Sequence, residues 1–175
     1  MSVSLCNLGS TSGGGGLTPK FQEFNSSGTF TPTQALIDAG GYIEIFLVAG
    51  GGRAFGYNTG FGGEVLMKKM YLSSTSGCAV TIGSGATTIR SNGGNSSFNG
   101  SSAGGINLTA AGGQYESNNY AILSPSWPGG NGVFGYGAAC KDSIEGPAAT
   151  LANSGQGGNG LFAGSSGYCL IKWYE

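Results

Sequence analysis

A long tract rich in glycine, serine and asparagine separates the two most hydrophobic segments of this chain, residues 42–49 and 167–175. Both segments are dense in β-branched and aromatic residues, are too short for a typical core helix, and are bounded by Gly and Ser. Each therefore predicts a β-strand. The tract between them cannot build a conventional core from its side chains. The sequence thus predicts a small β-scaffold that holds out extended glycine-rich segments.

The composition favours a folded chain over a disordered one. Glycine supplies 37 of the 175 residues, which is about three times its usual share. Disordered chains combine low hydrophobicity with high net charge. Here 39% of the residues are hydrophobic and the net charge is -1. We therefore expect an all-β fold, a small antiparallel β-sandwich-like scaffold whose glycine-rich loops include extended, polyglycine-like segments.

The low charge limits the partners. The seven Lys and Arg residues are scattered, and only Lys68 and Lys69 are adjacent, whereas a nucleic-acid surface needs several clustered cations. We therefore expect no nucleic-acid partner. No run of eighteen apolar residues occurs, so we expect no membrane insertion. The first residues lack the pattern of a secretory signal, and we expect synthesis in a cytoplasm, with release by lysis or within an assembly.

The cysteines and the missing histidine bear on metals and cofactors. The cysteines are Cys6, Cys78, Cys140 and Cys169, and no two have the spacing of paired zinc ligands. Because histidine is also absent, we expect no metal site and no cofactor. The spacing leaves disulfides open. Cys169 alternates within the last predicted strand, which favours a buried thiol that packs as a small hydrophobe.

Two regions are predicted along the chain. Residues 1–20 form an arm, either flexible or docked on a tail component or a neighbouring subunit through Leu5 and Leu8. Residues 21–175 form the glycine-rich β-domain. Residues 20–24 and 28–31 predict a first hairpin, and Leu36 and Ile37 are expected to enter the core.

Further strands follow in the sequence pattern. In residues 42–49 one face is wholly apolar and the other is mixed. Residues 62–72 predict a strand with a bulge or a sheet edge at Lys68 and Lys69, with a helix as the alternative because Leu66 and Met70 lie four apart. The remaining strand candidates are residues 78–83, 87–89 and 96–98.

Bulky aromatic residues lie between the glycines of the glycine-rich tract. Glycine backbones that pack against one another in extended segments would direct such side chains outward. These aromatics either plug loops locally or form a contact surface, since Tyr and Trp are enriched at interface hot spots. The candidates for receptor contact are Tyr115, Tyr120, Trp127, Phe134 and Tyr136. Residues 50–52 are interpreted as the start of this display region.

Catalytic patterns find little support. Residues 100–104 match a nucleophile elbow, but without histidine the usual Ser-His-acid triad cannot form. Residues 130–135 and 155–160 match a dinucleotide fingerprint, as chance predicts at this glycine content. A polysaccharide depolymerase would need two suitably spaced carboxylates, and the candidate acids are Asp38, Glu116, Asp142 and Glu145. We therefore expect no enzyme, with depolymerase activity as a minor alternative.

The order of these elements resembles the glycine-rich domains of bacteriophage tail fibres. The resemblance covers about residues 21–175, and its pieces are fairly specific as an ordered set. The matching pieces are residues 24–32 (FNSSGTFTP), 43–52 (IEIFLVAGGG), 62–65 (GGEV), 80–85 (VTIGSG), 95–100 (NSSFNG) and 167–173 (GYCLIKW).

The resemblance implies a phage tail-tip or receptor-binding protein whose glycine-rich segments contact a host surface receptor, either a glycan or an outer-membrane protein. It also implies other phage tail proteins as partners, a homotrimer and a place in the virion tail. The alternative is a structural virion protein, such as a tail-assembly or capsid decoration protein. The adhesins of T-even fibres pack polyglycine helices, but the runs here are short and interrupted, so we do not expect a regular polyglycine bundle.

Overall fold

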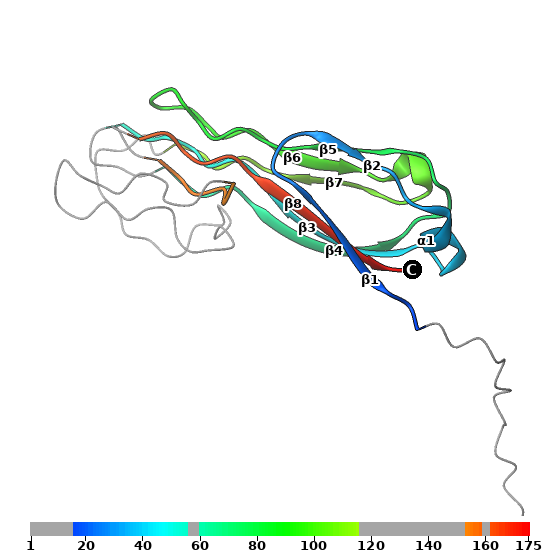
Figure 1. The fold of residues 1–175 in the computed structure, drawn as a ribbon. Coiled ribbons are helices and arrows are strands. Elements are labelled where there is room, and N and C mark those ends of the chain that lie inside the picture. The colour runs from blue at the N-terminus through cyan, green and yellow to red at the C-terminus, as the bar shows by residue number, and fades with distance from the viewer. Residues whose placement is uncertain (1–15, 56–59, 116–152, 159–161) are drawn as a thin grey trace, which may run out of the picture.

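The computed structural model describes residues 16–55, 60–115, 153–158 and 162–175, which fold into two antiparallel four-stranded sheets (Figure 1). Sheet A has the order β1 (Pro19–Phe24), β8 (Tyr168–Tyr174), β3 (Tyr42–Val48) and β4 (Val65–Tyr71). Sheet B has the order β2 (Gly28–Phe30), β5 (Cys78–Thr81), β6 (Ser96–Asn99) and β7 (Asn107–Ala110). The two short helices are α1 (Gln34–Asp38) and the 3-10 turn η1 (Ser101–Ala103). The predicted all-β sandwich is confirmed.

The core lies between the two sheets. In β3 the side chains of Ile43, Ile45 and Leu47 are buried, whereas the alternate positions Tyr42, Glu44 and Phe46 are only partly covered. Across the sandwich they belong to one apolar cluster with Phe30 and Phe98, whose ring centroids lie 6.4 Å apart. The face assignment read from residues 42–49 is therefore confirmed.

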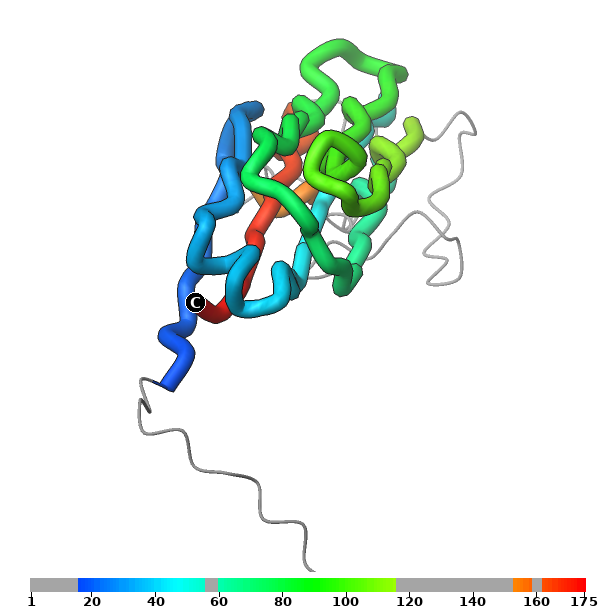
Figure 2. The backbone as a smooth tube through the Cα atoms, turned by 90° about the vertical axis from the view of Figure 1, so that its right-hand side faces the viewer, coloured from blue at the N-terminus to red at the C-terminus, as the bar shows by residue number. Residues whose placement is uncertain are grey.

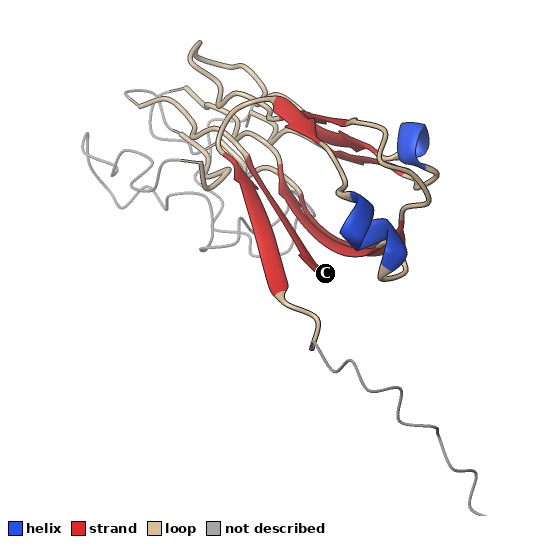
Figure 3. Ribbon diagram, turned by 45° about the vertical axis from the view of Figure 1, so that its right-hand side comes forward, coloured by secondary structure: helices blue, strands red, loops and turns tan. Residues whose placement is uncertain are grey.

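Helix α1 closes one end of the sandwich, opposite the glycine-rich segments (Figure 3). The Thr33 side chain caps it by accepting the Leu36 N–H at 3.1 Å. Leu36 is buried and Ile37 packs against the core, as predicted. The chain then turns into β3 through Gly41, whose positive φ of 71° favours glycine. A Cβ there would lie 1.9 Å from the Leu72 carbonyl oxygen.

The hairpin predicted near the start of the domain and the helix alternative for the β4 region were both wrong. The two strands of the expected hairpin exist, but they belong to different sheets: Phe24 lies opposite Cys169 in sheet A, and Phe30 lies opposite Cys78 in sheet B. The linking residues cross between the sheets, which lets both phenylalanines enter the core. Residues 65–71 form a strand, so the helix alternative was wrong.

The remaining strand predictions have mixed outcomes. The β3–β4 register is unbroken, so the strand carries no bulge at Lys68 and Lys69. Instead, β4 lies at the edge of sheet A, where both lysines are exposed. Residues 78–83 and 96–98 overlap β5 and β6, as predicted, whereas residues 87–89 form no strand. Strand β7 has a weak apolar pattern and was missed.

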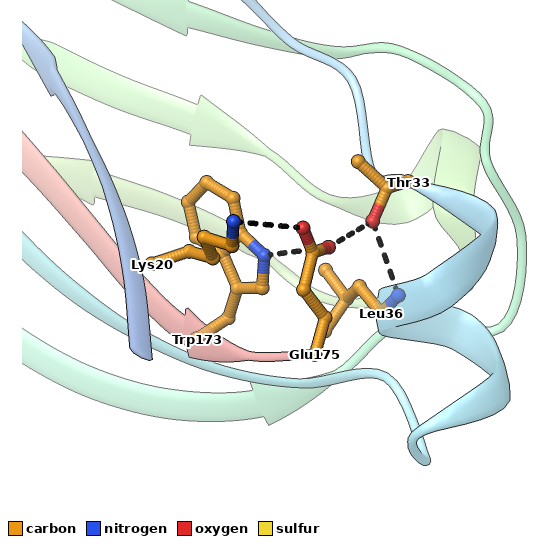
Figure 4. A network of polar contacts seen from close by, with 5 residues as sticks. All are labelled: Lys20, Thr33, Leu36, Trp173 and Glu175. Carbon is orange, nitrogen blue, oxygen red and sulfur yellow. Dashed lines mark hydrogen bonds and ion pairs between the residues drawn. The ribbon is translucent and has the colours of Figure 1, made fainter. Parts of the chain in front are cut away.

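Glu175, which follows β8, links that strand to β1 and to the start of α1 (Figure 4). The Glu175 carboxylate accepts hydrogen bonds from the Thr33 hydroxyl and, at 3.1 Å, from the Trp173 indole N–H, and it pairs with Lys20 at 3.9 Å. Hydrogen bonds from Thr33 and then Trp173 lower the pKa of Glu175. The backbone of Glu175 also pairs with Thr18, so the C-terminus lies beside the start of β1 (Figure 2).

Two of the four cysteines lie within the described residues. Cys78 and Cys169 are free thiols buried in the core, and burial raises the pKa of Cys169 to about 12. The prediction that Cys169 packs as a buried thiol is confirmed, while Cys6 and Cys140 lie outside the described residues. Within the described ranges, no helix is long and apolar enough to cross a membrane.

Candidate functional site

Glycine-rich segments gather beyond the ends of β3, β6 and β8, at the end of the sandwich away from α1 (Figures 1 and 3). The segment that continues β3, residues 50–52, lies at their centre and is buried. Each of its three residues donates and accepts one backbone hydrogen bond, all between 2.8 and 3.0 Å. Gly50 bonds to Gly94 and Gly113, Gly51 to Ser165 and Ala86, and Gly52 to Phe61 and Gly158.

These bonds reach six different segments from three successive residues. Bonds that change direction at every residue are typical of an extended helix with about three residues per turn. The neighbours are also bonded to one another in a closed ring around residues 50–52. In ring order they are residues 84–86, 93–94, 112–114, 60–63, 155–158 and 164–166. We call this seven-segment assembly the glycine bundle.

Close backbone approach explains the glycines of the bundle. A Cβ added at Gly51 would lie 2.0 Å from the Gln156 carbonyl oxygen, and one at Gly112 would lie 1.9 Å from the Gly93 carbonyl oxygen. No side chain fits at such distances. Short, interrupted glycine runs are sufficient here, because each run needs to supply only one segment of the assembly. The prediction that glycine backbones pack against one another is confirmed.

A buried serine joins the bundle to the sandwich. The Ser96 hydroxyl donates to the Val48 carbonyl at 2.7 Å and accepts the Gly83 N–H at 2.9 Å. Ser96 is fully buried at the start of β6. Its hydroxyl therefore satisfies one backbone group of β3 and one of the segment that follows β5.

The far end of the bundle carries exposed apolar and aromatic side chains. There the backbone of Arg53 pairs with both Ser91 and Gly158, which brings the bases of three loops together. The Arg90 guanidinium lies 4.6 Å from the ring centroid of Phe55, in a cation–π contact. We define the tip surface by its described residues: Phe55, Ile89, Arg90, Tyr115 and Phe162.

Only part of the predicted site can be placed. Tyr115 lies on the tip surface with 39% of its area exposed, and its N–H donates to the Asn92 side chain at 3.0 Å. The other predicted receptor-contact residues, Tyr120, Trp127, Phe134 and Tyr136, lie outside the described residues. So do the predicted anchors Leu5 and Leu8.

Sequence reasoning did not include the other members of the tip surface. Phe55 and Phe162 each lie within a few sequence positions of glycines of the bundle. That closeness in sequence was the only signal that could have selected them as site residues. Residues 50–52, interpreted as the start of the display region, are instead the buried centre of the bundle. The first exposed apolar side chain after this segment is that of Phe55.

The catalytic patterns have structural roles where they are described. Within residues 100–104, Ser101 and Ser102 lie in η1, and the Ser102 hydroxyl donates to the Gly77 carbonyl at 2.7 Å. Asp38 accepts from the Gln34 side chain at the end of α1, whereas Glu116, Asp142 and Glu145 lie outside the described residues. Residues 155–158 belong to the bundle. No group of three metal-ligating side chains occurs in the described part of the chain.

A second candidate site is an open groove of about 600 Å³ on the outer face of sheet A. Its lining comes from β3, β4 and β8, with Asn25 and Asn153 at one end. Glu44 pairs with Lys69 at 3.0 Å and accepts from the Tyr42 hydroxyl at 3.1 Å. These hydrogen bonds, first that of Lys69 and then that of Tyr42, lower the pKa of Glu44. Burial raises the pKa of Tyr168 to about 12, and a hydrogen bond with Glu23 adds to the shift.

Comparison of the chain with protein-family models, with curated proteins and with solved structures finds no match. The candidate sites are therefore interpreted from their own geometry and chemistry.

Proposed function

We propose that this chain is a non-enzymatic receptor-binding module of a bacteriophage tail, which attaches the virion to the host cell surface through the tip surface. The observation that carries this proposal is the closed glycine bundle, which ends in exposed aromatic residues. The resemblance of the ordered sequence elements to those of tail-fibre domains supports the same class.

The bundle suits binding because it holds loop bases in fixed positions. Its backbone groups bond to one another in the centre and around the ring, and the loops emerge where Arg53 pairs with Ser91 and Gly158. Side chains presented on a rigid support lose less conformational entropy when they bind. Phe55 and Tyr115, which are 49% and 39% exposed, are residue types that provide large, rigid contacts.

Binding to bacterial cells and envelope fractions tests this function. The labelled protein is expected to bind susceptible cells and to block adsorption of phage that carry it. The double change Phe55→Ala and Tyr115→Ala should weaken binding about tenfold or more. Ile106→Ala removes an equally exposed side chain from the sandwich, ahead of β7, and should leave binding unchanged. Absence of both cell binding and adsorption block would contradict the proposal.

A structural virion role is the second candidate, and the outer face of sheet A favours it. Four apolar or aromatic side chains there are more than half exposed: Phe21, Met67, Tyr71 and Tyr174. Such a patch is typical of an interaction surface. Contact with other tail proteins or with two further copies in a trimer would cover it.

Deletion of residues 1–15, which leaves Thr18 and the whole of β1 in place, separates the two candidates. A structural role predicts lost particle assembly with no effect on host range. For the receptor-binding role, tip substitutions change host binding while particles still form. Depolymerase activity would instead appear as shortened polysaccharide after incubation with the protein.

A further inference from the structure

The outer face of sheet A carries apolar and aromatic side chains in rows that cross the strands. Within the described part of the chain, Phe21, Met67, Tyr71 and Tyr174 are each more than half exposed on this face. In the strand order β1, β8, β3 and β4, the register defines two such rows. The apolar row is Glu23, Leu170, Phe46 and Met67, and the tyrosine row is Pro19, Tyr174, Tyr42 and Tyr71.

A charged row lies between the apolar row and the tyrosine row. In the same strand order it is Phe21, Lys172, Glu44 and Lys69. Glu44 pairs with Lys69 at 3.0 Å, whereas Lys172 makes no ion pair within the described residues. Lys68 lies opposite the core-facing Ile45 and so points away from this face. With Glu23 included, the carboxylates and the ammonium groups of the face balance, so the face does not select a strongly charged partner.

This order of side chains matches itself about one two-fold axis. The axis lies along the strands, midway between β8 and β3, at the centre of the sheet. Rotation about it lays each row on the same row of a second copy with the strand order reversed, so that β3 lies over β8. Lys172 then faces Glu44 of the second copy, and the reverse pair forms at the same time. In the other two rows, Leu170 faces Phe46 and Tyr174 faces Tyr42.

The twist of the sheet is compatible with this axis. A twisted sheet that is turned about a line along its strands keeps the same saddle shape. Two such faces therefore stay parallel, about 10 Å apart, as in an aligned β-sandwich. The open groove lies over the apolar row, and the Met67 side chain, which is exposed, unbranched and flexible, can bend into the groove of the second copy.

Other arrangements of copies use this order less well. A two-fold axis that runs across the strands, through the charged row, would place Lys172 over Lys172 and Glu44 over Glu44, so like charges would meet. A cyclic trimer joins two different patches of each chain. The self-matching rows of sheet A would then have no role.

We propose that the outer face of sheet A binds a second copy of this chain in a two-fold symmetric dimer. Contacts within the apolar row and the tyrosine row remove hydrophobic surface from water, and the two Lys172–Glu44 pairs fix the register. Because the axis runs along the strands, both glycine bundles lie at the same end of the dimer. Two tip surfaces would then engage one cell surface together and gain avidity. Only this last consequence rests on the proposed receptor binding.

Analytical ultracentrifugation of the full chain, from about 1 to 200 µM, tests the dimer. A monomer–dimer equilibrium with a micromolar dissociation constant is expected, because a single four-stranded face is small for a stable interface. Glu44→Lys and Lys172→Glu should each weaken dimerisation at least about tenfold, since each places like charges opposite one another at two positions. Lys68→Glu is the matched control: it reverses a charge on the other side of β4 and should leave the constant unchanged.

Mixing the two single variants makes the test specific to this axis. A dimer with one Glu44→Lys chain and one Lys172→Glu chain has opposite charges at both positions, so an equimolar mixture should recover most of the parent's association. Circular dichroism checks that each variant is folded. Tyr174→Ser tests the apolar contact without a charge and should weaken dimerisation severalfold. Ile106→Ser, which removes a similarly exposed side chain outside sheet A, should have no effect.

Three results would overturn the dimer. They are a parent chain that stays monomeric or forms a trimer, a Lys68→Glu effect as large as that of Lys172→Glu, and folded single variants that do not associate on mixing. Cell binding through the tip surface is measured separately with the change Phe55→Ala and Tyr115→Ala. Failure of the dimer and failure of the proposed function are therefore distinguishable.

Discussion

The sandwich and the glycine bundle share continuous chain segments but are held together differently. In the sandwich, β3 buries Ile43, Ile45 and Leu47 against side chains of the opposite sheet. Immediately after β3, residues 50–52 have no side chains to bury and instead bond to six neighbouring backbones. One segment of chain thus passes from packing through side chains to packing through backbone within a few residues.

The difference determines which substitutions each region tolerates. A hydrophobic core accepts changes that conserve volume and apolar character, usually at modest cost. The bundle leaves no space for an added side chain, because a methyl group at Gly51 would overlap the Gln156 carbonyl. Sequence variation is therefore expected in the loops beyond the bundle and in exposed sandwich positions, and not at the packed glycines.

The largest effect is expected in the sandwich core, from Phe98→Ala. Phe98 is fully buried and its ring contacts that of Phe30, so the change leaves a large cavity. The free energy of unfolding should fall by about 3–5 kcal/mol. Urea denaturation measures it, with Phe98→Leu as the milder control. Equal losses for both variants would show that the two sheets are not packed around this ring.

Gly51→Ala tests the bundle in the same way. The methyl group has to displace backbone atoms that lie about 2 Å from it, and the expected loss is about 3 kcal/mol. Gly16→Ala is the matched control, because a Cβ at Gly16 has no neighbour within 4 Å. If both alanine variants unfold at the same urea concentration as the parent, the backbone packing is refuted.

Ser96→Ala tests the joint between the two regions. It leaves the Val48 carbonyl and the Gly83 N–H without their buried partner, which is expected to cost about 1–3 kcal/mol. Ser97→Ala, one residue along β6 on the opposite face, should have little effect. Thermal unfolding of the two variants measures the two losses of stability. A much larger loss for Ser96→Ala than for Ser97→Ala shows that this hydroxyl couples the two regions.

A smaller, pH-dependent effect is expected at the C-terminus. The pKa of Glu175 is lowered, first by the hydrogen bond from Thr33, so its carboxylate stabilises the fold above its unfolded-state pKa. That contribution is lost as the pH falls through the lowered pKa. Glu175→Gln should therefore reduce stability at pH 7 and lose its difference from the parent at acid pH. Lys20→Gln, which keeps the bonds from Thr33 and Trp173, should show a weaker version of the same profile.

The strands of the sandwich could largely be predicted from the sequence, because their pattern is local. Alternation in residues 42–49 identified the buried face, and the lysines of β4 indicated a sheet edge. Partner choice is not local. Phe24 and Phe30 lie six positions apart, and only the three-dimensional core separates them into two sheets.

For the bundle, only the general mode of packing could be predicted from the sequence. Glycine content implied backbone packing, but the ring joins segments as distant as residues 60–63 and 155–158, and irregular glycine spacing carries no sign of that order. For the same reason, Phe55 and Phe162 were not selected for the tip surface. The outer groove of sheet A was missed because its lining comes from three strands that are distant in sequence.

Hydrogen exchange at the amides of Gly50, Gly51 and Gly52 tests the backbone-packed bundle most directly. Each amide donates to a different segment at 2.9–3.0 Å in a buried position, so its exchange requires the bundle to open. Protection comparable to that of the Ile45 and Leu47 amides in β3 is predicted. Exchange of all three amides at the rate of an unstructured peptide would contradict the bundle.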